Sequence, residues 1–205
     1  MVDLRCESAP VAKNDLFIKL AEDLARQVGL KAPASPAELL AQLRDGTIDI
    51  AMASTFPTLE DPDLHLLPGL GVTAAGPAMS VRLLSRVPVA QIRTLALDAH
   101  SRSSTVLARI VLAEGYGVLP HCEELPPDPK AMLAQADAAV LIGDIGLMAS
   151  GEGLFDLDLG AAWYELTGLP FYFAGWVARD RTLLEVAAPL LYDSCDAGLA
   201  RLDAI

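Results

Sequence analysis

The sequence predicts an α/β fold made of two lobes with mostly parallel sheets. Segments typical of strands alternate with segments typical of helices along the 205 residues. Strand candidates such as 94–98 and 138–142 are continuous apolar runs, as expected for parallel strands that helices cover on both faces. A chain of this length can bury two small cores, which is why we expect two lobes.

Capping residues indicate where the helices begin and end. Ser35, Pro36 and Glu38 predict a helix start, with Ser as the cap, Pro at the first helical position and Glu three residues after the cap. Gly46 predicts the end of that helix. In chain order, the expected elements are a strand at 3–7, helices at 15–28 and 36–45, a strand at 47–53, two extended stretches within 64–84, a strand at 94–98, a helix at 105–114, a short edge strand within 119–130, a helix at 129–136, strands at 138–142 and 169–178, and a helix at 181–199.

The lobe boundaries are expected near residues 90 and 168. Residues 1–90 together with 169–205 would form lobe I, and residues 91–168 would form an inserted lobe II, joined to it by two crossing strands. Ligands of such sheets bind beyond the carboxyl ends of the strands. Small polar residues at those ends are therefore the candidate binding residues.

Composition and charge exclude several classes of partner. The net charge of −12 argues against a nucleic-acid partner, which needs a basic face. No apolar run reaches the roughly 18 residues of a membrane span, and the first residues lack the apolar core of a secretory signal. Cys6, Cys122 and Cys195 are odd in number and lack CxxC spacing, which favours reduced thiols. We therefore expect a cytoplasmic protein without a membrane partner.

No metal and no organic cofactor is expected. His65, His100 and His121 have no ligand-like spacing with one another or with the cysteines. The chain contains no GxSxG, Walker, GxGxxG or HExxH string. The expected partner is a small molecule, and no feature of the sequence indicates an oligomeric state.

Ser103, Ser104 and Thr105 form the most informative polar segment, because they lie between a strand and a helix. Their hydroxyls and the free backbone N–H groups would point at one place, where the helix dipole adds positive potential. Such a place would hold a carboxylate or phosphate without an excess of Lys or Arg. The alternative is ordinary capping of the helix by serine.

Two further strand ends carry small polar residues. Ser54 and Thr55 follow one buried strand, where they are either ligand donors or part of a turn. Gly143 and Asp144 follow another. Asp144 would orient a substrate hydroxyl, or it would cap a helix that begins at Ile145.

Four other residues are candidates for the same site. Ser80 ends a polar segment at an expected crossing between the lobes. Asn14 would cap the first helix or offer its amide to the site. Arg82 and Arg102 would neutralise an acidic ligand or project into solvent.

Six short strings resemble, in this order, segments of the menaquinone-biosynthesis family that contains chorismate dehydratase and 1,4-dihydroxy-6-naphthoate synthase. They are Gly76–Val81 (GPxxSV), Ser103–Thr105 at a helix start, Leu141–Asp144 (LIGD), Asp158–Trp163 (DLGxxW), Leu166–Phe171 (LTGLPF) and Phe173–Val177, all within residues 43–179. This resemblance implies a type II periplasmic-binding-protein-like fold with the substrate between the lobes.

The resemblance implies a lyase that converts chorismate to 3-[(1-carboxyvinyl)oxy]benzoate in the futalosine pathway, without a cofactor. By position, Ser54, Ser80 and Ser103–Thr105 would line the cleft that holds this carboxylate substrate. Thr55, Gly143 and Asp144, chosen from the strand ends, complete the predicted substrate-binding residues. Asn14 and Ser80 would be the catalytic residues.

Two departures keep alternatives open. The dehydratase branch usually has a YLNT-like string after its first strand, whereas this chain has Lys13–Phe17 (KNDLF), which is closer to the NDxF string of the synthase. The synthase in turn uses a histidine near the position of Gly143, where this chain is dehydratase-like. The alternatives are a non-catalytic protein that binds a small carboxylate, and a synthase-like enzyme.

Overall fold

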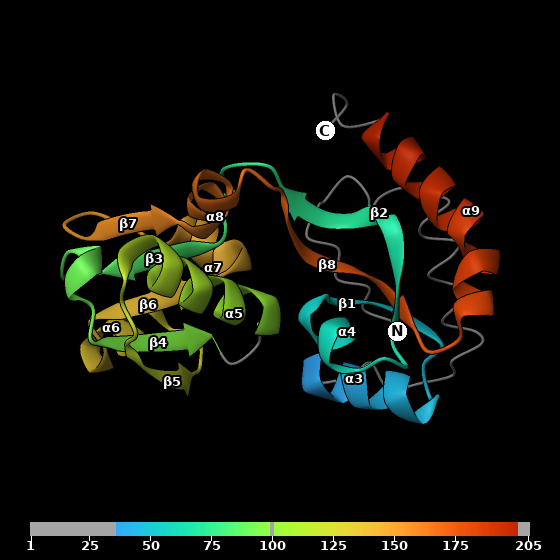
Figure 1. Ribbon diagram of the computed structural model, residues 1–205, viewed down its shortest axis with the longest axis horizontal. Coiled ribbons are helices and arrows are strands. Elements are labelled where there is room, and N and C mark those ends of the chain that lie inside the picture. Colours follow the sequence, from blue (N-terminus) through green and yellow to red (C-terminus); the bar gives the residue numbers. More distant parts are fainter. Residues whose placement is uncertain (1–35, 99–100, 201–205) are drawn as a thin grey trace. The chain divides into compact units, whose positions relative to one another are not determined.

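The computed structural model describes residues 36–98 and 101–200 (Figure 1). The expected strand at 3–7, the expected helix at 15–28 and Asn14 lie outside these residues. The chain forms two compact units. Among the described residues, the first comprises 36–53, 58–71 and 175–200, and the second comprises 54–57, 72–98 and 101–174.

The first unit contains a three-stranded sheet in the order β1-β8-β2. Its strands pack against helices on both faces, because neighbouring residues of β8 enter different cores. Val177 packs with Leu43 of α3, whereas Trp176 packs with Leu184 and Leu191 of α9. The elements are α3 (Pro36–Asp45), β1 (Ile50–Ser54), α4 (Phe56–Glu60), β2 (His65–Ala74), β8 (Phe171–Ala178) and α9 (Arg181–Leu199). The unit limits fall within β1, α4, β2 and β8.

The second unit contains a five-stranded sheet in the order β5-β4-β6-β3-β7. Strand β4 pairs in parallel with β5 and β6, while β3 pairs antiparallel with β6 and β7, so four of the five strands run in one direction. This agrees with the expected, mostly parallel sheet. The elements are β3 (Arg82–Ser85), η1 (Val89–Gln91), β4 (Thr94–Asp98), α5 (Arg102–Ile110), η2 (Val111–Gly115), β5 (His121–Leu125), α6 (Pro129–Gln135), β6 (Ala138–Leu141), α7 (Gly143–Met148), β7 (Phe155–Asp158) and α8 (Leu159–Thr167).

Alternate residues of the second sheet face two separate cores. Leu83 and Val140 pack with residues of α5 and α8, and the next residues along the same strands, Leu84 and Leu141, pack with Met132 of α6. All five of these side chains are fully buried. Burial on both faces explains why the strands are continuous apolar runs in the sequence.

The expected start of the helix at Thr105 is wrong. Helix α5 begins at Arg102, because the Ser101 hydroxyl accepts a hydrogen bond from the backbone N–H of Ser104 (3.3 Å) and caps the helix three residues earlier. Most of the expected polar turn is thus the first helical turn. The helix also continues as the short π-helical segment η2, which ends at Gly115.

The compact units differ from the expected lobes at their first boundary. Residues 72–90 belong to the second unit, whereas the sequence suggested a boundary near residue 90. The reason is strand β3, which pairs with β6 on one side and with β7 on the other. This pairing makes it an interior strand of the second sheet.

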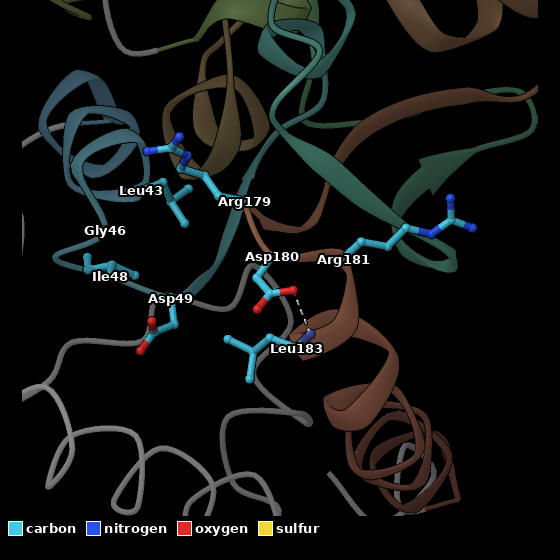
Figure 2. A pocket seen from close by; sticks show the side chains of 8 residues that line it. All are labelled: Leu43, Gly46, Ile48, Asp49, Arg179, Asp180, Arg181 and Leu183. Atoms are coloured by element: carbon cyan, nitrogen blue, oxygen red, sulfur yellow. Dashed lines mark hydrogen bonds between the residues drawn. The ribbon is translucent and has the colours of Figure 1, made fainter.

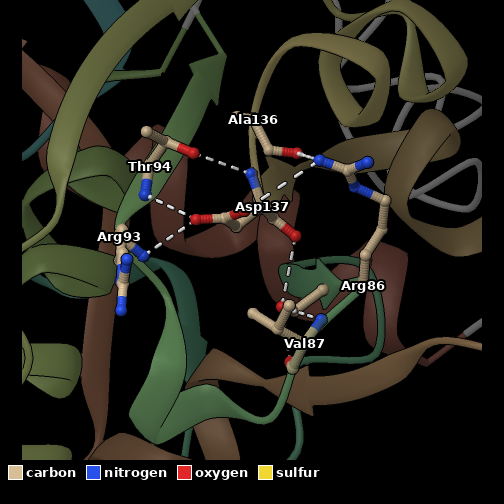
Figure 3. Close-up of polar contacts among 7 residues, drawn as sticks. Arg86, Val87, Arg93, Thr94, Ala136 and Asp137 are labelled. Carbon is tan, nitrogen blue, oxygen red and sulfur yellow. Dashed lines mark hydrogen bonds and ion pairs between the residues drawn. The ribbon is translucent and has the colours of Figure 1, made fainter.

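Asp137 ties the starts of neighbouring strands together in this unit (Figure 3). Its Oδ2 accepts hydrogen bonds from the backbone N–H groups of Arg93 and Thr94, both at 3.0 Å. The Asp137 N–H donates to the Thr94 hydroxyl (2.9 Å), and the Arg86 guanidinium lies 4.0 Å from Oδ1. The hydrogen bond from Arg93, supported by those from Thr94 and by the charge of Arg86, holds the pKa of Asp137 below its usual value.

We expect Asp137→Asn to lower the free energy of unfolding at pH 7 by about 1–2 kcal/mol, since charge-assisted hydrogen bonds are lost at a partly exposed site. A carboxylate with a lowered pKa stabilises the fold above the ordinary Asp value of about 3.9, and this contribution is lost as the pH falls through the folded pKa. The difference between the wild type and Asp137→Asn should therefore shrink below about pH 4. Urea unfolding at several pH values measures it, with the exposed Asp193→Asn as control. A difference that stays constant with pH would contradict this role.

Candidate functional site

Three of the predicted site residues meet in one hydrogen-bonded group, here called the hydroxyl cluster: Ser54, Thr55 and Ser103. The Ser103 hydroxyl oxygen lies 2.6 Å from that of Ser54 and 3.2 Å from that of Thr55. It also accepts from the backbone N–H of Phe56 (3.2 Å), and the Ser103 N–H donates to the Ser54 hydroxyl (3.1 Å). Ser103 is only 3 % exposed. Residues 54–56 are thereby joined to the start of α5 within the second unit.

The directions of these hydrogen bonds limit what the cluster can offer a ligand. The Thr55 hydroxyl donates to the Tyr172 carbonyl (2.6 Å), so toward Ser103 it can only accept. Ser103 then donates either to Thr55 or to Ser54. In the first case the Ser54 hydroxyl donates its hydrogen bond to Ser103. In the second case the Ser54 hydroxyl proton is free for another acceptor. Within the cluster, the Ser54 hydroxyl is thus the donor available to a ligand.

The other two members of the Ser103–Thr105 segment act within the protein. The Thr105 hydroxyl donates to the Ser101 carbonyl (2.5 Å). The Ser104 N–H is bonded to the Ser101 hydroxyl, and the Ser104 side chain is 4 % exposed. The capping interpretation therefore describes much of this segment, and fewer donors remain for an anion than the sequence suggested.

Ser80 lies in a tight turn that follows β2. The Ser80 N–H donates to the Ala78 carbonyl (2.5 Å), which closes a three-residue turn, and Met79 at its centre has a φ of +57°. Among the described residues, the Ser80 hydroxyl bonds only to the same Ala78 carbonyl (3.3 Å). No hydrogen bond in this part of the chain joins it to the hydroxyl cluster.

Gly143 and Asp144 begin the six-residue helix α7. Ile142 is the cap, without a side-chain hydrogen bond, and Gly143 has a φ of +58°. Asp144 is an exposed residue of the first turn, and the expected cap at Asp144 is therefore wrong. The same helix packs beside Ser80, since a Cβ on Gly146 would lie 2.2 Å from the Ser80 carbonyl oxygen. Ser80, Gly143 and Asp144 are thus grouped around α7.

A hollow of about 380 Å³ lies next to the Ser80 turn, lined by Met79, Arg82, Leu147, Asp156 and Asp158. The Arg82 side chain is only 14 % exposed and donates to Asp156 through Nε (3.1 Å) and Nη2. Its Nη1 donates to the carbonyls of Gly146 (2.8 Å) and Ala149 (2.9 Å). The hydrogen bond with Asp156 raises the pKa of Arg82. Its guanidinium braces β3 against β7 and α7, so it does not serve as the anion partner that the sequence suggested.

A second hollow, of about 500 Å³, lies in the first unit (Figure 2). Two of its charged residues, Arg179 and Asp180, are engaged within the protein. Asp180 accepts from the N–H groups of Thr182 (2.8 Å) and Leu183 (3.3 Å) at the start of α9, and Arg179 donates to the Arg44 carbonyl. None of the predicted site residues lines it. The residues around it are Leu43, Gly46, Ile48, Asp49, Arg179, Asp180, Arg181 and Leu183.

Within residues 36–98 and 101–200, no three His, Cys, Asp or Glu side chains are grouped so that they could hold a metal ion. No helix in the same residues is both long and apolar enough to span a membrane.

Sequence reasoning missed Asp158 as a site residue. Its carboxylate accepts from the N–H groups of Ala78 (3.0 Å) and Met79 (2.7 Å), the two residues before Ser80. The available signal was the start of α8, where Asp before a helix is a good cap, and Asp158 does accept from the Ala161 N–H (2.9 Å). Nothing in the local sequence points to the turn 80 residues earlier.

Comparison with known proteins confirms the predicted family and fold. A protein-family model for menaquinone biosynthesis matches residues 14–205. Chorismate dehydratase of Thermus thermophilus is 29 % identical over 188 residues, a match that covers 82 % of this chain and 69 % of that protein.

Two solved structures share the fold. The periplasmic aliphatic sulphonate binding protein SsuA of Escherichia coli has a TM-score of 0.63 at 17 % identity, with 96 % of this chain and 68 % of SsuA covered. Protein AF1704 of Archaeoglobus fulgidus has a TM-score of 0.59 at 17 % identity, with 81 % of this chain and 64 % of AF1704 covered. This chain therefore spans less than two thirds of AF1704. At these identities the likeness shows a periplasmic-binding-protein-like α/β fold. Since the family model extends over almost its whole length, the chain belongs to the menaquinone biosynthesis family.

Proposed function

We propose that the protein is a cytoplasmic chorismate dehydratase-like lyase, which converts chorismate to 3-[(1-carboxyvinyl)oxy]benzoate. The observation that carries the proposal is the match to the menaquinone biosynthesis family together with the similarity to the chorismate dehydratase of Thermus thermophilus. The dehydratase-like Gly143-Asp144 pair supports the dehydratase over the sister synthase. From the resemblance, a synthase would be expected to have a histidine near the position of Gly143.

The reaction needs few protein groups. The proton on C3 of chorismate leaves to a base, the C4–O bond breaks, and the hydroxyl departs as water once it has gained a proton. The electron pair of the C3–H bond completes an aromatic ring. Most candidate residues offer hydroxyl donors, which suit positioning and charge stabilisation. We therefore assign the base to a carboxylate of the substrate itself.

The proposed roles follow from the hydrogen bonds. The Ser54 hydroxyl, the available donor of the hydroxyl cluster, donates a hydrogen bond to a substrate carboxylate. The Ser80 hydroxyl donates to the ring substituents. To do so it gives up its long 3.3 Å hydrogen bond to the Ala78 carbonyl. Asn14, carried over from the resemblance, contributes its amide.

A second candidate function is the binding of a small carboxylate without catalysis. Two observations favour it. The hydroxyls of Ser103 and Thr105 bond within the protein, which leaves few donors to stabilise charge, and the chain lacks the YLNT-like string. The same fold serves binding alone in SsuA, described as a sulphonate binding protein.

We expect the purified protein to convert chorismate to a product lighter by one water, at a rate above that of a protein-free control. Liquid chromatography with mass spectrometry measures the product, and calorimetry measures binding in parallel. Saturable binding of chorismate without turnover would replace the dehydratase by the binding protein. Neither turnover nor binding would refute both.

Ser80→Ala and Asn14→Ala should each lower kcat about 10- to 100-fold, because one hydrogen bond to a charged group contributes about 1.5–3 kcal/mol. Steady-state kinetics with chorismate measures the effect. Ser150→Ala is a matched control in the same unit, since Ser150 is exposed and its hydroxyl only accepts from Glu152. Equal activity of Ser80→Ala and Ser150→Ala would remove Ser80 from the site.

Ser54→Ala should raise the KM for chorismate about tenfold, because it removes the free donor of the hydroxyl cluster. Ser85→Ala is the control: the Ser85 hydroxyl is also buried and donates to the carbonyls of Val87 (2.7 Å) and Asp137 (3.2 Å). Both variants should lose stability in urea, and only Ser54→Ala should change the KM. The same KM in both would show that the cluster is purely structural.

A further inference from the structure

The turn that carries Ser80 is held from three sides. A Cβ on Gly160, in α8, would lie 2.7 Å from the Gly76 carbonyl oxygen and 2.8 Å from the Ala78 Cβ. A Cβ on Gly146, in α7, would lie 2.2 Å from the Ser80 carbonyl oxygen. The third side is the Asp158 carboxylate, which receives the N–H groups of Ala78 and Met79. Such close approach leaves the turn little freedom to move.

The conformation of this turn is an unfavourable one for its sequence. Met79 has a φ of +57° and is the only residue other than glycine with a positive φ in residues 36–98 and 101–200. Its side chain is 67 % exposed, so burial of that side chain does not enforce the conformation. Backbone strain of this kind persists where surrounding contacts impose it, and such places are often functional. Here the contacts are the hydrogen bonds from Ala78 and Met79 to Asp158.

Asp158 differs from other caps in the protein. The Asp128 carboxylate accepts both of its hydrogen bonds from its own helix α6, from the N–H groups of Lys130 (2.9 Å) and Ala131 (3.1 Å). Asp180 does the same for α9. Asp158 accepts one bond from its own helix, from Ala161, and two from the turn. Capping of α8 alone therefore does not account for this carboxylate.

We propose that Asp158 is a positioning residue: its carboxylate holds the Ala78–Ser80 turn and thereby sets the place of the Ser80 hydroxyl. This inference rests on the proposed function for the role of Ser80. Two charge-assisted hydrogen bonds fix the amides directly before Ser80, and the Ser80 N–H is in turn bonded to Ala78. Loss of the carboxylate would release the strained turn while leaving the Ser80 side chain in the protein.

Asp158→Ser separates the two tasks of this residue. Serine is a good helix cap with one acceptor oxygen, so it keeps α8 capped and cannot hold both turn amides as well. Asp128→Ser is the matched control, because it makes the same change at a cap that contacts no turn of the site. We expect kcat for chorismate to fall at least tenfold in Asp158→Ser, with the KM changed less than threefold and the thermal midpoint close to that of Asp128→Ser. Asp128→Ser should keep the wild-type kcat.

A second measurement does not depend on turnover. Amide hydrogen exchange and ¹H–¹⁵N shifts of Ala78, Met79 and Ser80 report the turn directly in the full chain. We expect all three amides to shift, and the Met79 amide to exchange at least tenfold faster, in Asp158→Ser and not in Asp128→Ser.

The outcomes separate this inference from the proposed function. Unchanged amides in Asp158→Ser would overturn the positioning role whatever the activity. Changed amides with an unchanged kcat in an active protein would overturn it as well. If the amides change in Asp158→Ser but the wild-type protein neither binds nor converts chorismate, the result would support the hold of Asp158 on the turn and refute the proposed function.

Discussion

The requirement that buried hydroxyls find hydrogen-bond partners shapes the candidate site in the second unit of this protein. Buried hydroxyls cost free energy when they are left unpaired, so the small polar residues at the strand ends first satisfy one another. The 2.6 Å contact between the hydroxyls of Ser54 and Ser103 is the centre of this arrangement. It joins residues 49 positions apart in the sequence. The Ser54 hydroxyl is the one donor of the group that can turn from its protein partner to a ligand. A site of this kind is built for orientation more than for charge.

The charges of the protein are consistent with that view. The chain has a net charge of −12, and Arg82, the cation that lines the hollow beside the Ser80 turn, is bonded to Asp156 and to two backbone carbonyls. In the proposed function, an anionic substrate would therefore be held mainly by dipoles, from hydroxyls and from backbone N–H groups. Fixed dipoles cost no reorganisation when charge moves during a reaction, provided that the backbone which carries them is rigid. Rigidity of the turns at the strand ends then becomes part of the chemistry.

Much of the fold could be predicted from the sequence, and the failures have physical causes. Strand β4 at Thr94–Asp98 and helix α9 at Arg181–Leu199 were predicted with the bounds found, because a strand buried on both faces is an apolar run and because Asp180 caps the helix. The start of α5 was misplaced because Ser101, rather than a later residue, provides the cap. Helix α8 was not anticipated. Of the candidate site, Ser54, Thr55 and Ser103 were predicted because ligands of such sheets bind where strands end, and the structure brings these three hydroxyls together.

Asp158 shows why the remainder lay beyond sequence reasoning. A carboxylate has room for several donors, and local sequence accounts only for the one from Ala161. The other two come from Ala78 and Met79, and Met79 has a positive φ, which is unfavourable for a residue with a side chain. A local preference for negative φ at Met79 would have predicted a different turn, and only the tertiary contacts of Asp158, Gly146 and Gly160 override it. Local and tertiary preferences conflict most strongly at Met79, next to the residue that we assign to catalysis, as expected where function is maintained at a cost in stability.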